Sequence, residues 1–156
     1  MNAITKRRLV RIAAISVAFV VGWFALSLTR TIREIPEAYA AWDTGTLLTT
    51  YMDQSDGKWP SSWDELSTVI GEEQPMLFAR SDSDGNPISK SEYIEKLRSM
   101  IKIDWSFDPV PGTLDSPVTR IDGGKFRTVW VGAEPNEMVR SFIAHRKNTQ
   151  NATGSQ

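Results

Sequence analysis

A long apolar segment near the start of the chain constrains the fold more than any other feature. From Ile12 to Leu28 the sequence carries no charged side chain. A helix over this segment would be roughly 26 Å long, because each residue adds about 1.5 Å. That length is close to the minimum needed to span the hydrocarbon core of a bilayer. The sequence therefore predicts a transmembrane helix over residues 12–29.

Basic residues before this segment predict its orientation. Residues 1–11 contain no acid and four basic side chains, namely Lys6, Arg7, Arg8 and Arg11. Segments rich in lysine and arginine next to a membrane span stay in the cytoplasm. On the far side, Arg30 and Arg33 are offset by three acids, Glu34, Glu37 and Asp43, so they give no competing bias. We expect a single-pass protein of the cytoplasmic (inner) membrane, with residues 1–11 in the cytoplasm and residues 30–156 outside it.

A cleaved signal peptide is the alternative interpretation of the same segment. Ala38-Tyr39-Ala40 has the small-x-small pattern of a cleavage site. Such a site normally follows the apolar core closely, whereas this one lies well beyond Leu28 with charged residues between. We therefore expect the anchor to be retained. The chain has no cysteine, which excludes disulfides, thiolate catalysis and cysteine metal sites.

The charges of the chain are unevenly distributed. All 19 acidic residues follow position 29, whereas four of the 18 lysines and arginines precede it and 14 follow it. Residues 30–156 thus carry an excess of five negative charges. An acidic domain does not suit nucleic acid, because phosphates require a basic face. We expect the lipid bilayer and proteins of the cell envelope as partners, and no cofactor.

Helical periodicity continues beyond the apolar segment. One stripe at helical spacing contains Ile32, Ile35, Tyr39, Trp42 and Thr46, and an adjoining stripe contains Ala38, Ala41, Gly45, Leu48 and Met52. The pattern predicts one long helix that becomes amphipathic after the membrane and ends near Met52. Pro36 should interrupt one hydrogen bond in it, and Gly57 and Pro60 should prevent its continuation.

The remainder of the chain alternates short helical and strand patterns. Capping-box spacing predicts a short helix after Ser62 and a longer one over residues 89–100, where Glu92 follows Ser89. Residues 101–108 alternate apolar and polar side chains and predict a strand. Residues 119–132 predict a hairpin that turns at Gly123-Gly124, flanked by Asp122 and Lys125. Residues 134–147 predict a closing helix, and residues 148–156 a disordered tail.

These elements predict an α+β domain over residues 30–147. The long helix should pack on a small antiparallel β-sheet, because a hairpin is not stable alone in water. Its expected contact residues are Ile35, Tyr39, Trp42 and Leu48. The expected face of the sheet carries Ile103, Trp105, Phe107, Phe126 and Trp130.

This order of parts resembles type IV pilins and type II secretion pseudopilins. Those proteins have a short basic N-terminus, an apolar helix that becomes amphipathic, and a small antiparallel sheet packed on it. The resemblance covers residues 5–70, and the run TYMDQSDGKWPSSWDEL at residues 50–66 is similar to the end of the long helix in major pseudopilins. It implies a pilin-like fold and a link to secretion or surface assembly.

One feature of the pilin pattern is missing. The stretch KRRLVRIAAIS at residues 6–16 has no glycine before the apolar segment, and no acid precedes Glu34. The resemblance implies that the prepilin peptidase needs that glycine, and that subunits use an early glutamate to set register. The sequence therefore predicts a pilin-like domain on a permanent anchor, not a subunit that polymerises.

Few residues suggest chemistry. Asp82, Asp84 and Asn86 place oxygen donors at alternate positions, which suits calcium or an ordinary solvated turn. His145 lies four residues after Ser141, but a triad needs more than this pair. The adjacent acids Asp64-Glu65 and Glu72-Glu73 point to different faces, so each pair favours surface charge over one site.

The tryptophans leave two functions open. Trp59, Trp63, Trp105 and Trp130 are suited either to a hydrophobic core or to a platform for sugars. We expect a non-enzymatic membrane-anchored envelope protein that acts through protein contacts. The alternative is an anchored carbohydrate-binding module or hydrolase that uses exposed tryptophans and acids.

Overall fold

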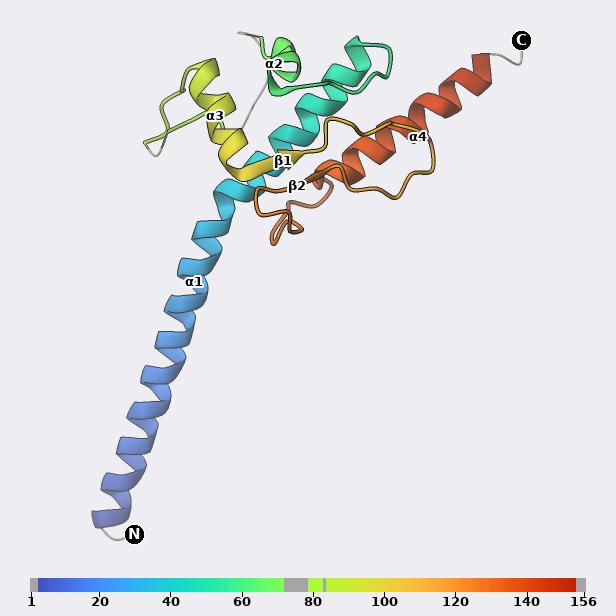
Figure 1. Ribbon diagram of the computed structural model, residues 1–156. Coiled ribbons are helices and arrows are strands. Elements are labelled where there is room, and N and C mark those ends of the chain that lie inside the picture. Colours follow the sequence, from blue (N-terminus) through green and yellow to red (C-terminus); the bar gives the residue numbers. More distant parts are fainter. Residues whose placement is uncertain (1–2, 72–78, 83, 154–156) are drawn as a thin grey trace. The chain divides into compact units, whose positions relative to one another are not determined.

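The computed structural model describes residues 3–71, 79–82 and 84–153 (Figure 1). The chain divides into two compact units, Met1–Ile35 and Pro36–Gln156. Within the described residues there are five helices and one two-stranded antiparallel sheet. The predicted α+β class is therefore confirmed.

Helix α1, Ala3–Gln54, forms the first unit and continues into the second. The predicted continuous helix is confirmed, and Pro36 lies inside it. In the first unit, five large apolar side chains are between 61% and 73% exposed, namely Phe19, Val20, Val21, Trp23 and Phe24. Among the residues that the structure describes, no helix is both long and apolar enough to cross a membrane. Many side chains of the segment 12–29 lie outside the described residues.

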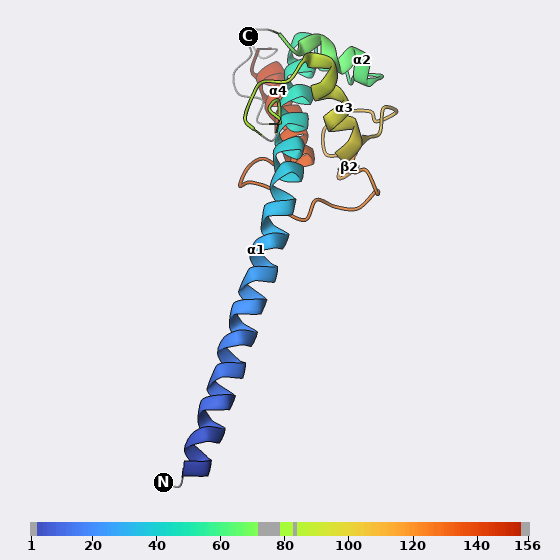
Figure 2. The ribbon, with the colours of Figure 1, turned by 90° about the vertical axis from the view of Figure 1, so that its left-hand side faces the viewer.

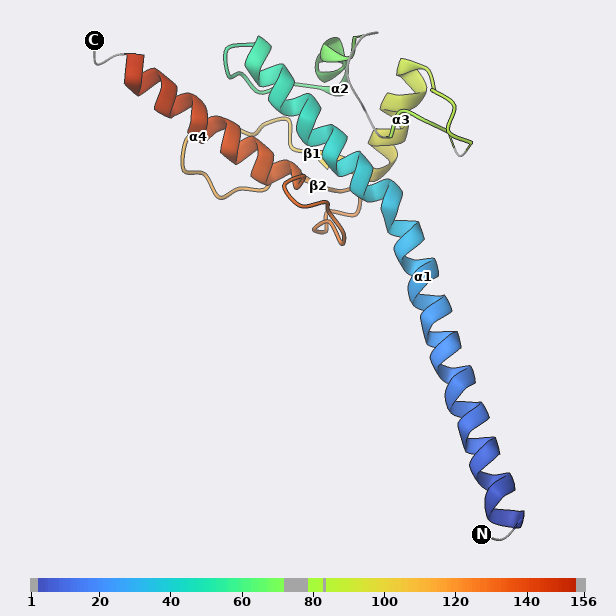
Figure 3. The same ribbon diagram turned by 180° about the vertical axis from the view of Figure 1, so that it is seen from behind.

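The second unit is built around residues 36–54 of α1. Figures 1 and 3 show α3, Lys90–Met100, on one side of this stretch and α4, Pro135–Thr153, on the other. Because helices cover two sides of it, α1 is buried around most of its circumference from Ala38 to Met52. The predicted stripe of Ala38, Ala41, Gly45, Leu48 and Met52 is buried, whereas Tyr39, Trp42 and Thr46 are half-buried.

A glycine permits the close approach of α1 and α4. A Cβ atom added at Gly45 would lie 2.6 Å from Met138 Sδ and 3.1 Å from the Cα of Pro135. The methionine can move, but the backbone at Pro135 must shift to make room. The position is therefore closely packed.

Replacement of Gly45 by valine should destabilise the second unit by about 1–3 kcal/mol, the usual cost of overpacking a core. Chemical denaturation of the full chain in detergent, followed by tryptophan fluorescence, measures the change. Gly22→Val is the matched control, because nothing lies within 4 Å of a Cβ at that helical glycine. Equal effects at the two positions would contradict a tight contact between α1 and α4.

Helix α2, Trp63–Leu66, and the 3₁₀ helix η1, Ser67–Val69, follow α1. Ser62 caps α2 as predicted, since its hydroxyl accepts from the backbone N–H of Glu65 at 3.2 Å. The carboxylate of Glu65 does not complete the capping box. It accepts instead from the Ser61 hydroxyl at 2.6 Å, the Ser61 N–H at 2.7 Å and the phenol of Tyr51. Glu65 thereby joins α2 to α1.

These contacts predict a loss of stability in acid. Hydrogen bonds from the Ser61 hydroxyl, the Tyr51 phenol and the Ser61 N–H lower the pKa of Glu65 from 4.5 to about 2. Because the folded pKa lies below the unfolded value, the stabilisation is present above 4.5 and is lost as pH falls towards 2. Thermal melts across this pH range should show a smaller acid-induced fall in Tm for Glu65→Gln than for the wild type. An equal fall in Tm with pH for the variant and the wild type would contradict the lowered pKa of Glu65.

Helix α3 begins with a complete capping box. The Ser89 hydroxyl accepts from the Glu92 N–H at 3.3 Å, and the Glu92 carboxylate accepts from the Ser89 N–H at 3.0 Å. Tyr93, Ile94 and Leu97 form its buried face. The predicted helix, cap and apolar face are all confirmed.

The sheet is smaller than predicted. Strand β1, Ile101–Ile103, pairs antiparallel with β2, Val118–Arg120, and Ile101 lies opposite Arg120. The predicted strand over 101–108 is wrong after Ile103, because Asp104 forms a turn in which its carboxylate accepts from the Ser106 N–H at 2.9 Å. Burial still alternates along residues 101–108, so the side-chain pattern is right although the backbone leaves the sheet.

The predicted hairpin over residues 119–132 is also wrong. The turn forms, since the Gly123 N–H donates to the Arg120 carbonyl at 2.8 Å and the Arg120 N–H donates to the Gly124 carbonyl at 3.0 Å. However, β2 pairs with β1, and residues 125–131 form no strand. Asp122 pairs with Arg120 at 3.2 Å instead of with Lys125.

The expected packing of helix on sheet holds for some residues only. Leu48, Ile103 and Val118 belong to one buried cluster, and Tyr39 contacts Trp130 with ring centroids 5.6 Å apart. Phe126 and Trp130 lie in a loop, so no sheet face carries them. The core collects residues from all parts of the unit, including Leu47, Leu66, Leu97, Ile101, Val139 and Ile143.

Helix α4 closes the second unit. Its start at Pro135 and its apolar stripe agree with the prediction, since Val139 and Ile143 are buried and Phe142 is half-buried. The helix continues to Thr153, so it includes part of the segment 148–156 that the sequence predicts as a disordered tail. Residues 154–156 lie outside the described residues.

Candidate functional site

The residues predicted to set membrane orientation lie in α1. Lys6, Arg7, Arg8 and Arg11 are within the helix Ala3–Gln54, and their side chains lie outside the described residues. Their predicted role in topology therefore remains a prediction.

The calcium candidate is a turn that satisfies its own polar groups. Asp82 Oδ1 accepts from the backbone N–H groups of Asp84 at 2.9 Å and Asn86 at 2.8 Å, and Asp82 Oδ2 accepts from Asn86 Nδ2 at 3.2 Å. Hydrogen bonds from Asn86 and Asp84 lower the pKa of Asp82. Within the described residues, no group of three or more His, Asp or Glu side chains is placed to hold a metal ion. The geometry favours the solvated-turn interpretation over calcium.

All four candidate tryptophans pack on another aromatic ring; Trp59, Trp63 and Trp105 are half-buried, whereas Trp130, which packs on Tyr39, is 41% exposed. Trp63 and Trp105 meet edge to face at 5.5 Å, and Trp59 meets Phe107 edge to face at 4.9 Å. Trp59 Nε1 also donates to the Asp104 carbonyl at 2.9 Å. All three rings are half-buried and pack against the hydrophobic core. This arrangement favours a packing role for Trp59, Trp63 and Trp105.

The remaining candidates for chemistry lie apart from one another. His145 and Ser141 are exposed on α4. Asp64 is exposed on α2, whereas Glu65 is engaged by Tyr51 and Ser61. Glu72 and Glu73 lie outside the described residues. The described side chains therefore bring none of these groups into a shared site.

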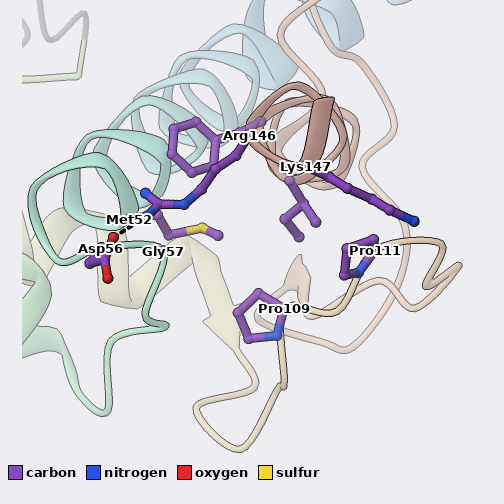
Figure 4. A pocket seen from close by; sticks show the side chains of 9 residues that line it. Met52, Asp56, Gly57, Pro109, Pro111, Arg146 and Lys147 are labelled. Atoms are coloured by element: carbon purple, nitrogen blue, oxygen red, sulfur yellow. Dashed lines mark hydrogen bonds and ion pairs between the residues drawn. The ribbon is translucent and has the colours of Figure 1, made fainter. Parts of the chain in front are cut away.

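A small open pocket lies between the end of α1 and α4 (Figure 4). Its volume is about 230 Å³. The lining combines the ion pair of Arg146 and Asp56 with five apolar side chains, namely Met52, Pro109, Pro111, Phe142 and Ile143. Gly57, at φ +83°, leaves room for the Arg146 guanidinium, whose Nε would lie 3.1 Å from an added Cβ. Figure 4 shows Arg146 extended towards Asp56 and Lys147 directed away from it.

This pocket was not predicted, because Asp56 and Arg146 are 90 positions apart and follow no common pattern. Ligand pockets usually enclose about 300–1,000 Å³, so the volume is small. Its lining pairs the guanidinium with a carboxylate and offers no nucleophile beside a base. The lining is therefore better suited to holding the loop 104–117 against α4 than to catalysis.

The most unusual polar group is a buried acid on α1. Asp43 is 1% exposed, and its Oδ2 accepts from the Tyr93 phenol at 3.0 Å and from the Ala79 N–H at 2.7 Å. Burial, followed by the nearby Asp43 carboxylate, raises the pKa of Tyr93 well above its ordinary value. The phenol therefore stays protonated and donates. Asp43 joins α1, α3 and the segment that begins at Ala79.

Sequence reasoning treated Asp43 only as one charge after the anchor. A signal was available, because its neighbours one helical turn away, Ala40 and Leu47, are apolar and buried. An acid within an apolar helix face must find donors or titrate. Here the Tyr93 phenol and the Ala79 N–H donate to it, so the arrangement is a structural junction.

A second polar junction ties α1 to the chain after β2. Glu37 Oε2 pairs with Arg120 Nε at 3.0 Å, and Glu37 Oε1 accepts from the Arg127 N–H at 3.3 Å. Arg120 also pairs with Asp122. The start of the second unit is thus fastened to the loop between β2 and α4.

Comparison with protein-family models, curated proteins and solved structures gives no match. The likeness to pilins therefore rests on the sequence pattern of residues 5–70.

Proposed function

We propose that the protein is a single-pass, membrane-anchored envelope protein whose pilin-like, non-enzymatic domain acts through protein contacts, in secretion or surface assembly. The N-terminus is inside, residues 12–29 span the cytoplasmic membrane, and residues 30–156 lie outside. The observation that carries this proposal is the exposure of the five apolar side chains between Phe19 and Phe24.

The positions of these side chains support a lipid environment. Successive helical residues are separated by about 100° around the axis, so Phe19, Val20 and Val21 alone point to three different sides. A helix that is apolar on every side is typical of a membrane span. The basic residues before it and the mixed charges after it support the proposed orientation.

The described side chains of the second unit support a role in contacts. Asp43, Glu65 and Asp82 each accept two or more hydrogen bonds from neighbouring groups of the fold. The anchored hydrolase or sugar-binding module is the weaker candidate, because Trp59, Trp63 and Trp105 are half-buried and pack against the core.

Site-specific photocrosslinking in cells tests the proposed protein contacts. A photoreactive amino acid at exposed positions of the second unit, such as Leu114 and Val110, should give discrete adducts with envelope proteins. The same residue at the buried position Leu97 is the control and should give none. Failure of every exposed position to yield an adduct, in a chain that remains folded, would contradict a contact function.

A further inference from the structure

The loop between β2 and α4, residues 121–134, exposes three large apolar side chains. Ile121 is 57% exposed, Trp130 is 41% exposed and Val131 is fully exposed. Figure 2 shows this loop, in orange, beside the part of α1 that follows Pro36. We use the name β2–α4 loop for residues 121–134.

Contacts hold this loop at the beginning of the second unit. The Arg127 N–H donates to Glu37, and the Trp130 ring packs on Tyr39 at 5.6 Å. The ion pair of Arg120 with Glu37 fixes the residue just before the loop to the same turn of α1. The loop is therefore fastened to residues 37–39, close to where the unit begins at Pro36.

The length of chain between the proposed span and this turn limits how far the loop can lie from the bilayer. From Thr29 to Glu37 there are eight steps along the chain. They cover about 12 Å as a helix and at most about 29 Å when fully extended. The contacts with Glu37 and Tyr39 therefore tether the β2–α4 loop to residues that follow the proposed span within this length of chain.

The chemistry of the loop matches that surface. Tryptophan and tyrosine are enriched where a protein crosses the headgroup layer of a bilayer, and Trp130 packs against Tyr39 here. Lys125 and Arg127 are exposed in the same loop, whose two acids, Asp122 and Glu134, pair with Arg120 and Arg140. Basic side chains near a bilayer are attracted to anionic headgroups.

We infer that the β2–α4 loop docks on the bilayer surface. Val131 and Ile121 enter the boundary between headgroups and acyl chains, Trp130 lies at headgroup depth, and Lys125 and Arg127 face anionic lipid. The occupant of this apolar surface is lipid, not a protein. The inference rests on the proposed anchoring of residues 12–29.

The absence of cysteine permits a depth measurement with single labels. Full-length Val131→Cys, Thr68→Cys and Phe19→Cys carry an environment-sensitive fluorophore in vesicles of phosphatidylethanolamine and phosphatidylglycerol. Lipids with spin labels at the headgroup or deep in the acyl chain quench nearby fluorophores. Thr68 is an exposed control. Thr68 follows α2, and Glu65 of α2 accepts a hydrogen bond from the Tyr51 phenol. Tyr51 lies about 18 Å along α1 from Tyr39.

The expected result is a blue shift and strong quenching by headgroup spin labels at position 131, and neither at position 68. Position 19 should be quenched by the deep label, which reports the anchor independently. Deep quenching at 19 without quenching at 131 would overturn the docking and leave the anchor intact. Equal quenching at 131 and 68, or a blue shift at 131 without quenching by the headgroup label, would also overturn it. No quenching at 19 would overturn the anchor and the docking together.

Discussion

Replacement of Asp43 by alanine is expected to lower the free energy of unfolding of the second unit by about 2–6 kcal/mol. The substitution leaves the Tyr93 phenol and the Ala79 N–H buried without their acceptor, and each unsatisfied buried donor costs about 1–3 kcal/mol. A domain is typically stable by about 5–15 kcal/mol, so this loss is a large fraction of the total. Urea denaturation of the detergent-solubilised full chain, followed by tryptophan fluorescence, measures it.

Two controls separate this junction from ordinary loss of an acid. Tyr93→Phe removes one donor and keeps the carboxylate bound to Ala79, so the loss should be about 1–3 kcal/mol. Asp122→Ala removes an acid that is 54% exposed in its pair with Arg120, and exposed pairs contribute about 0–1 kcal/mol. A loss for Asp43→Ala no larger than that for Asp122→Ala would show that the buried junction does not stabilise the fold.

Two arginines placed in the proposed span should release the protein from the membrane. Each arginine near the centre of a transmembrane helix costs about 2.5–3.5 kcal/mol, so Val21→Arg with Phe24→Arg should cost about 5–7 kcal/mol together. We expect most of the double variant to leave the membrane fraction on alkaline extraction, whereas the wild type stays.

Leu114→Arg is the matched control for this pair, because Leu114 is an exposed apolar residue of the second unit at 88% exposure. It should remain in the membrane fraction. Retention of the double variant at the wild-type level would mean that residues 12–29 do not hold the protein in lipid.

Local signals in the sequence predicted the helices well. The capping box of Ser89 and Glu92, the proline at the start of α4 and the spacing of Tyr93, Ile94 and Leu97 each act within a turn or two of helix. Their energetics depend on neighbours that are close in sequence. The same holds for the turn at Gly123, whose φ of +79° requires glycine.

Long-range pairings could not be predicted in the same way. Residues 101–108 alternate correctly, but the Asp104 carboxylate closes a turn on Ser106 and ends the strand. The partner of β2 is β1, because Val118 lies opposite Ile103 in the register that brings two buried side chains together. The Asn136 side chain also bonds both the N–H and the carbonyl of Val118, each at 2.9 Å, and nothing in the sequence indicated this.

Among the candidate sites, too, local features could be predicted from the sequence and long-range contacts could not. The turn at Asp82 was recognised from its spacing, and its hydrogen bonds favour the solvated interpretation. The junctions at Asp43, Glu37 and Arg146 each join residues 36 or more positions apart. Only the folded chain brings such residues together.

The topology of the intact chain tests the central claim most directly. Asn2→Cys and Leu114→Cys are treated in intact spheroplasts with a maleimide that cannot cross membranes, and the labelled chain is then weighed by mass spectrometry. The account predicts that position 114 reacts without lysis, that position 2 reacts only after lysis, and that both residues belong to a full-length chain in the membrane fraction. A soluble product beginning at Ala41, or labelling of position 2 in intact spheroplasts, would contradict it.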